Sequence, residues 1–73
     1  MTGAHRLVVV RCDGIAHTSD FSGWHSETAA FRYFNDAKQD KRTVFAIVFQ
    51  ATDAADPKWY GRAEYHDVET KHD

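Results

Sequence analysis

The first apolar segment of the chain has the pattern of a β-strand. Residues Arg6–Cys12 read Arg-Leu-Val-Val-Val-Arg-Cys, which is β-branched in the middle and too short for a stable helix. The Asp13-Gly14 pair that follows favours a two-residue hairpin turn, since both positions tolerate a positive φ. We therefore predict a return strand from Ile15 to about Phe21.

A two-residue turn also predicts the strand register. Val10 would face His17 and Val8 would face Ser19, because side chains alternate between the two faces of a strand. One face of the hairpin would then carry Val8, Val10, Cys12 and Ile15, and the other Leu7 and Val9.

Helical spacing of apolar residues begins after Ser22-Gly23. The stretch from Glu27 to about Lys41 places one apolar stripe on a helix, formed by Ala30, Phe31, Phe34 and Ala37. Ser26 is the predicted N-cap, and basic residues at the far end suit the helix dipole. Trp24, just before this helix, is expected to close the core.

Two further strands are predicted in the second half. Thr43–Gln50 is apolar on both faces, which is typical of a central strand. From Trp59 to Val68 the chain alternates as an edge strand with one wet face. Its inner face would hold Trp59, Gly61, Ala63 and Tyr65, and its wet face Tyr60, Arg62, Glu64 and His66.

The element order predicts an α+β fold of ββαββ type. The sheet would have four antiparallel strands in the order 2-1-3-4, with the one helix packed on one face. We expect a single domain over residues 1–73, with an ordered core of about 5–68.

Composition places the chain among soluble proteins of a reducing compartment. The 73 residues contain one cysteine, so no disulfide forms within the chain, and a lone cysteine suits the cytoplasm. The longest apolar run, Val44–Phe49, is far shorter than a membrane span. The net charge of −2 gives no attraction to nucleic acid or anionic lipid.

One helix covers only one face of such a sheet, so the other face is a candidate partner surface. We expect this uncovered face to carry five aliphatic residues: Leu7, Val9, Val44, Ala46 and Val48. They would dock on another protein or on a second copy of the chain. In the alternative, the termini and the 51–58 loop fold across them.

The Tyr60–His66 edge is a second candidate surface. Trp59 and Tyr60 with Arg62 nearby match the composition of binding hot spots, although Trp59 would also fit at the end of the core. Acidic residues beside them would attract a basic surface: Asp53, Asp56, Glu64 and Asp67.

Residues able to do chemistry are present but form no known signature. A catalytic or metal site would draw on Cys12, His17, Asp20, His25, His66 and His72, which lack the local spacing of nucleophilic or metal motifs. Cys12 is expected to be a small buried residue. We therefore predict no enzyme, no metal site and no cofactor. A small metal-binding protein, in which His17, His25 and His66 converge, stays an open alternative.

Nucleic-acid binding is the main alternative to protein binding. Lys38, Lys41 and Arg42 make a cationic helix end, and three arginines would add positive charge on the sheet: Arg6, Arg11 and Arg62. The aromatic residues Trp59, Tyr60 and Tyr65 could stack on bases. Interleaved acidic residues oppose this interpretation.

In size, acidity and layout, the whole chain resembles the compact accessory proteins that phages and mobile elements encode to inhibit a host complex, anti-CRISPR proteins among them. The resemblance is one of format, covers no motif and assigns no residue a role. It implies an inhibitor that covers a partner's working surface. We predict a non-enzymatic protein-binding module on this basis and on the uncovered face.

Overall fold

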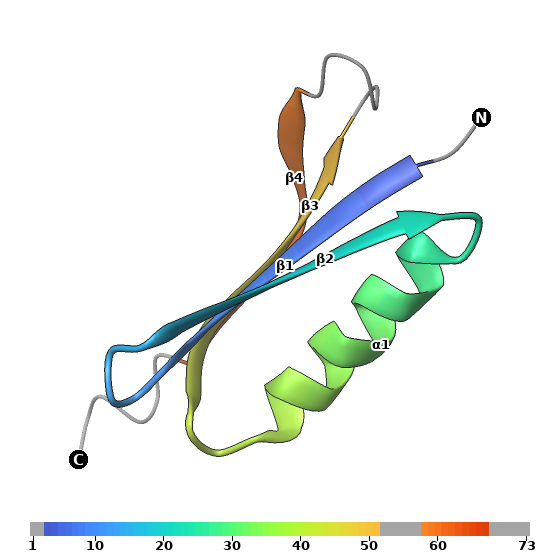
Figure 1. The fold of residues 1–73 in the computed structure, drawn as a ribbon. Coiled ribbons are helices and arrows are strands. Elements are labelled where there is room, and N and C mark those ends of the chain that lie inside the picture. Colours follow the sequence, from blue (N-terminus) through green and yellow to red (C-terminus); the bar gives the residue numbers. More distant parts are fainter. Residues whose placement is uncertain (1–2, 52–57, 68–73) are drawn as a thin grey trace.

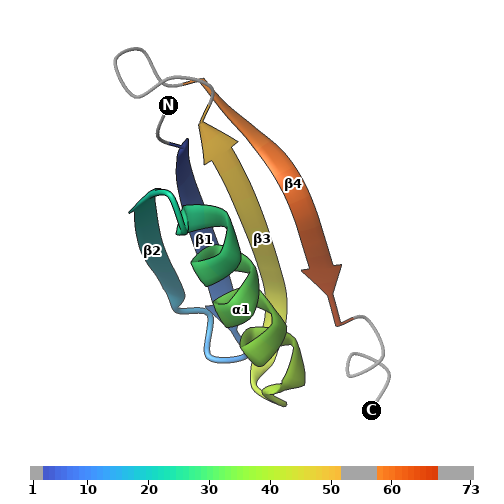
Figure 2. The same ribbon diagram turned by 90° about the vertical axis from the view of Figure 1, so that its right-hand side faces the viewer.

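The computed structural model describes residues 3–51 and 58–67, which form one sheet and one helix (Figure 1). The elements in chain order are β1 (Gly3–Arg11), β2 (Ala16–Gly23), α1 (Ser26–Gln39), β3 (Thr43–Ala51) and β4 (Trp59–His66). All strand pairs are antiparallel, and the order is β2-β1-β3-β4. The α1 helix packs on one face of this sheet, so the predicted ββαββ fold and its strand order are confirmed (Figure 2).

The connection from β2 through α1 to β3 determines which side of the sheet the helix covers. Because β2 and β3 both run antiparallel to β1, they are parallel to each other, and α1 is the crossover between them. The crossover is right-handed (Figure 2), as nearly all such connections are.

The β1–β2 hairpin has a longer turn than the predicted two residues. Residues 12–14 form the turn, which the Arg11 N–H closes by donating to the Ile15 carbonyl at 3.2 Å. Within it the Gly14 N–H donates to the Arg11 carbonyl at 2.8 Å, and the Ile15 N–H donates to Asp13 Oδ1 at 2.9 Å. Val9 therefore pairs with His17, and the predicted register is wrong by one residue. In consequence the odd-numbered residues of β2 share a face with Leu7 and Val9.

The helix begins at Ser26, which is not its N-cap. His25 occupies that position without a side-chain cap, and the Ser26 hydroxyl instead forms a buried hydrogen bond of 2.8 Å with His5 Nδ1. Burial of His5 lowers its pKa from the ordinary 6.5, with Glu27 opposing this shift. The helix start is thereby tied to β1.

The helix ends at Gln39, two residues earlier than predicted. The side chain and the backbone N–H of Arg42 both donate to the carboxylate of Asp40, and these bonds lower the pKa of Asp40 to about 2. This tight turn leads directly into β3. At the other end of the helix, Trp24 is 90% exposed, so the prediction that it closes the core is wrong.

The core lies between α1 and the two central strands. Its buried apolar residues are Leu7, Ala30, Phe34, Ala46 and Val48. Both Ala30 and Ala46 are fully buried, and their small side chains allow the helix to approach the sheet closely.

Candidate functional site

The face of the sheet opposite α1 has an apolar centre on the two middle strands. We call it the open face, and its central residues are Val8, Val10, Phe45, Ile47 and Phe49. Val8 pairs with Ile47 and Val10 with Phe45, so these side chains lie next to one another across the strands. All five are half-buried by their neighbours in the sheet, and no element within residues 3–51 and 58–67 packs over them.

Charged and aromatic side chains border this apolar centre. Toward β2, Arg6 donates two hydrogen bonds to Asp20, at 2.7 and 3.2 Å, and this pairing raises the pKa of Arg6 and lowers that of Asp20. The Arg6 guanidinium also lies 4.6 Å from the centroid of the Trp59 ring. The open face therefore has an apolar centre and a polar margin, the arrangement of many protein interfaces.

The β4 margin carries a second polar pair. His66 lies 3.1 Å from Glu64, and its ring packs edge-on against Phe45 with centroids 4.7 Å apart. Glu64 and His66 therefore border the open face, as the pairing of β3 with β4 requires.

The predicted aliphatic surface lies on the other side of the sheet. Leu7 and Val48 are buried under α1, and Val9 packs against the same cluster, so the prediction that they are uncovered is wrong. Ala46, predicted with them, is also in this core. Val44 is half-buried beside the irregularity in the β1–β3 register, and its carbonyl accepts the Asp67 N–H at 3.1 Å.

A register shift in β4 divides the predicted edge surface between the two faces. Val48 pairs with Ala63 and Phe49 with Gly61, which leaves Arg62 as the extra residue of a β-bulge. Trp59 therefore borders the open face with Glu64 and His66, whereas Tyr60 and Arg62 lie on the helix side. The strict alternation predicted for this strand is wrong.

The Arg62 side chain connects β4 to the helix. It donates hydrogen bonds to Gln50 Oε1 and, at 3.5 Å, to Glu27, and it lies 5.9 Å from the centroid of the Phe31 ring. These contacts link β4 to α1. Arg62 has a structural role on the covered face.

The five central residues of the open face were missed because both faces of β1 and β3 are apolar. The two faces differ only in which alternate residues of each strand point toward α1. The signal present in the sequence was side-chain size, because the larger residues of β3 alternate at positions 45, 47 and 49.

The candidate chemical residues that lie within the described ranges do not converge. His17 faces the helix side of β2, whereas Asp20 lies on the open face with Arg6. Among the described residues, no group of three His, Cys, Asp or Glu side chains is placed to hold a metal ion. His72, Asp53 and Asp56 lie outside the described residues.

Two nucleophilic side chains have distinct surroundings. The Ser26–His5 pair has the elements of a catalytic dyad, but Ser26 is 3% and His5 2% exposed, so no substrate reaches either. Cys12 lies exposed in the β1–β2 loop rather than buried as expected.

Three of the arginines considered for nucleic-acid binding pair with carboxylates: Arg6, Arg42 and Arg62.

Comparison of the chain with protein-family models, with curated proteins and with solved structures gave no match. The search for membrane spans covered the described residues and found no helix with the length and apolarity to cross a bilayer.

Proposed function

We propose that the chain is a non-enzymatic protein-binding module that docks its open face on the apolar surface of another protein. The observation that carries this proposal is the uncovered centre formed by Val8, Val10, Phe45, Ile47 and Phe49. An apolar patch that is continuous over two strands and bordered by polar residues is typical of a protein interaction site.

The distribution of side-chain size supports the proposal. Beneath α1 the sheet presents Ala46 and Val48, whereas the open face presents Phe45, Ile47 and Phe49 from the same strand. Burial of large apolar side chains contributes most of the free energy of association. The larger side chains of β3 thus lie on the side that no described element covers, where a partner can bury them further.

The residues at the margin of the open face favour binding to a different protein over binding to a second copy of the chain. Trp59 is 36% exposed and is held by the Arg6 guanidinium, and Trp and Arg are the residue types most enriched in binding hot spots. Since the strands are already ordered, docking costs little backbone entropy. A module of this kind acts by covering its partner's surface, as the inhibitor format implies.

Capture from a lysate of the source cells, with the purified chain as bait, tests the proposal. Ile47→Asp places a carboxylate at the centre of the open face, and Thr28→Asp adds the same charge to an exposed position of α1. The captured protein is then purified, and its affinity for each bait is measured by calorimetry. We expect Ile47→Asp to weaken binding at least tenfold and Thr28→Asp to leave it unchanged.

Light scattering of the purified chain provides the second readout, with circular dichroism as the folding control. We expect a monomer at micromolar concentration. A dimer that Ile47→Asp dissociates would show that a second copy occupies the open face, and equal binding by both variants would place the interface elsewhere. Either result contradicts the proposal.

A further inference from the structure

The outer edge of β2 has none of the features that usually protect an edge strand. Its pairing with β1 runs without a register shift over eight residue pairs, from Gly3 with Gly23 to Val10 with Ala16. The strand contains no lysine or proline, and its one carboxylate, Asp20, is paired with Arg6. By contrast, the β4 edge has a bulge at Arg62. A regular, unprotected edge is a template for another strand.

The groups that point away from β1 follow from the hairpin. The Arg11 N–H donates to the Ile15 carbonyl at 3.2 Å, so this pair belongs to the hydrogen-bonded set. Because such pairs alternate along an antiparallel ladder, the odd residues of β2 bond to β1. The N–H and C=O groups of the even residues point to the outer edge, where no described strand lies: Ala16, Thr18, Asp20 and Ser22.

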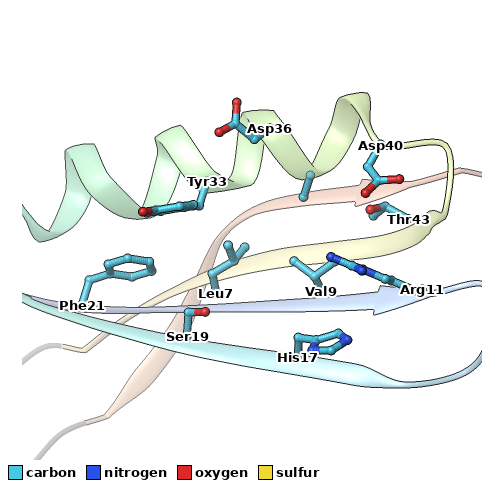
Figure 3. Close-up of a pocket in the computed structure, with 11 residues that line it drawn as sticks. Leu7, Val9, Arg11, His17, Ser19, Phe21, Tyr33, Asp36, Asp40 and Thr43 are labelled. Atoms are coloured by element: carbon cyan, nitrogen blue, oxygen red, sulfur yellow. The ribbon is translucent and has the colours of Figure 1, made fainter.

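A groove of about 540 Å³ runs between this strand and α1 (Figure 3). Leu7 and Val9 of β1 form its floor, and Ser19 borders it from β2. Phe21 and Tyr33 stack with ring centroids 5.6 Å apart and close one end. The groove thus has an apolar body beside an edge that can accept a strand.

The other end of the groove holds two buried polar atoms without a partner in the described part of the chain. They are Thr43 Oγ1 and Arg11 Nε, and Thr43 is only 1% exposed. A buried donor without an acceptor is costly, which favours a ligand that brings one. The carboxylates of Asp36 and Asp40 also line the groove, so a neutral acceptor suits it better than an anion.

We propose that an extended peptide adds to β2 as a fifth strand and inserts a tyrosine side chain into the groove between β2 and α1. The main-chain groups of the peptide bond to the outward groups of Thr18 and Asp20. The tyrosine ring reaches over β2 toward Leu7 and Val9, and its phenol oxygen accepts from Arg11 Nε. This mode of recognition obtains affinity from the backbone and specificity from the pocket. The site is separate from the open face and does not depend on it.

A displayed library of random dodecapeptides with a fixed central tyrosine is the probe. After selection on the full chain, the enriched peptide is synthesised and titrated by calorimetry. We expect Tyr→Phe in this peptide to weaken binding roughly tenfold or more, the effect of one hydrogen bond from a charged donor. Failure to select any binder, or equal binding by the Phe peptide, would overturn the proposal.

Two pairs of variants locate the site. Thr18→Pro removes an outward N–H without breaking a bond to β1, and Thr18→Val is its control. Ser19→Trp fills the groove from an exposed position, and Ser19→Thr is its control. We expect at least a tenfold loss of affinity for Thr18→Pro and Ser19→Trp, and less than a twofold change for the controls. A peptide lost only with Ile47→Asp would bind the open face instead, contrary to the proposal.

Hydrogen exchange of the unsubstituted chain gives a test that needs no variant to fold. The amides of Thr18 and Asp20 face solvent in the free chain and should exchange rapidly. With the selected peptide bound, we expect both to be protected at least tenfold, while the odd residues of β2 change less. Unchanged exchange at Thr18 and Asp20 would exclude strand addition at this edge.

Discussion

A pair of Val→Thr substitutions distinguishes the two faces of the sheet. Val48 on β3 is fully buried under α1, whereas Val8 on β1 is half-buried at the centre of the open face. Both lie in central strands, and threonine matches valine in shape and β-branching. The difference between the variants therefore reports the surroundings of the added hydroxyl.

The expected magnitudes follow from burial. At position 48 the hydroxyl enters the Leu7, Ala30 and Phe34 cluster, where burying it without a full hydrogen bond costs about 1–3 kcal/mol. At position 8 it can reach water, and a change within about 0.5 kcal/mol is expected. For a 73-residue chain with about 0.05–0.15 kcal/mol of stability per residue, the first loss is a large fraction of the total.

Urea denaturation, followed by far-UV circular dichroism and by tryptophan fluorescence, measures both changes at equal protein concentration. We expect Val48→Thr to lower the midpoint clearly, with an unchanged m-value, and Val8→Thr to leave it nearly unaltered. Equal losses would refute the reasoning, because the open face would then be as dry as the core. Repeating the Val8→Thr measurement over a hundredfold range of concentration shows whether self-association causes such a loss.

Three further predictions concern single residues. Because burial lowers the pKa of His5, the unfolded chain binds a proton at this residue more readily than the folded chain does. The free energy of unfolding should therefore be highest above about pH 6.5 and should fall as the pH decreases toward the pKa of the folded state. In urea titrations from pH 5 to 8, His5→Gln should flatten this dependence, whereas the exposed control His17→Gln should retain it. The Asp40 carboxyl should titrate near pH 2 by NMR, and Arg42→Gln should raise its pKa toward 3.8; an unchanged value would show that these bonds do not form in solution. Gly23→Ala should lower the free energy of unfolding by about 1 kcal/mol or more, because φ is +95° at this position. Gly61→Ala should lower it by less, because the added Cβ would lie 3.7 Å from Ile47 Cδ1, an ordinary van der Waals contact. Thermal unfolding measures both changes, and the reverse order would contradict the turn at Gly23.

The fold could be predicted from the sequence because each element has a strong local signal. The helical stripe around Phe34, the β-branched run of β1 and the two-faced apolar pattern of β3 leave few arrangements once connections must be short. The errors arose where one residue more or less changes a face. A three-residue hairpin turn, in place of the predicted two residues, shifted the β2 register, and a bulge at Arg62 divided the edge strand. Neither the turn nor the bulge changes the pattern of apolar and polar residues along the sequence.

The choice of covered face required information that periodicity does not contain. Handedness places α1 on one side of the sheet, but it does not say whether Leu7 or Val8 points to that side. The small residues of β3 resolve the question, because a helix packs closely over Ala46 and would be held away by Phe45. The same observation could have been made from the sequence, since Ala30 on the helical stripe needs an equally small neighbour to approach the sheet.

That arrangement of sizes also connects the fold to its surfaces. A chain that folded only to bury its own apolar area would place Phe45, Ile47 and Phe49 under the helix and leave the alanine side to solvent. In the structure, the alanine side is covered and the phenylalanines lie on the open face. Folding therefore uses the smaller share of the apolar surface of β3 for the core and leaves the larger share on the open face. Since burying a phenylalanine stabilises by more than burying an alanine, the open face has more to gain from association than the core gains from the same strand.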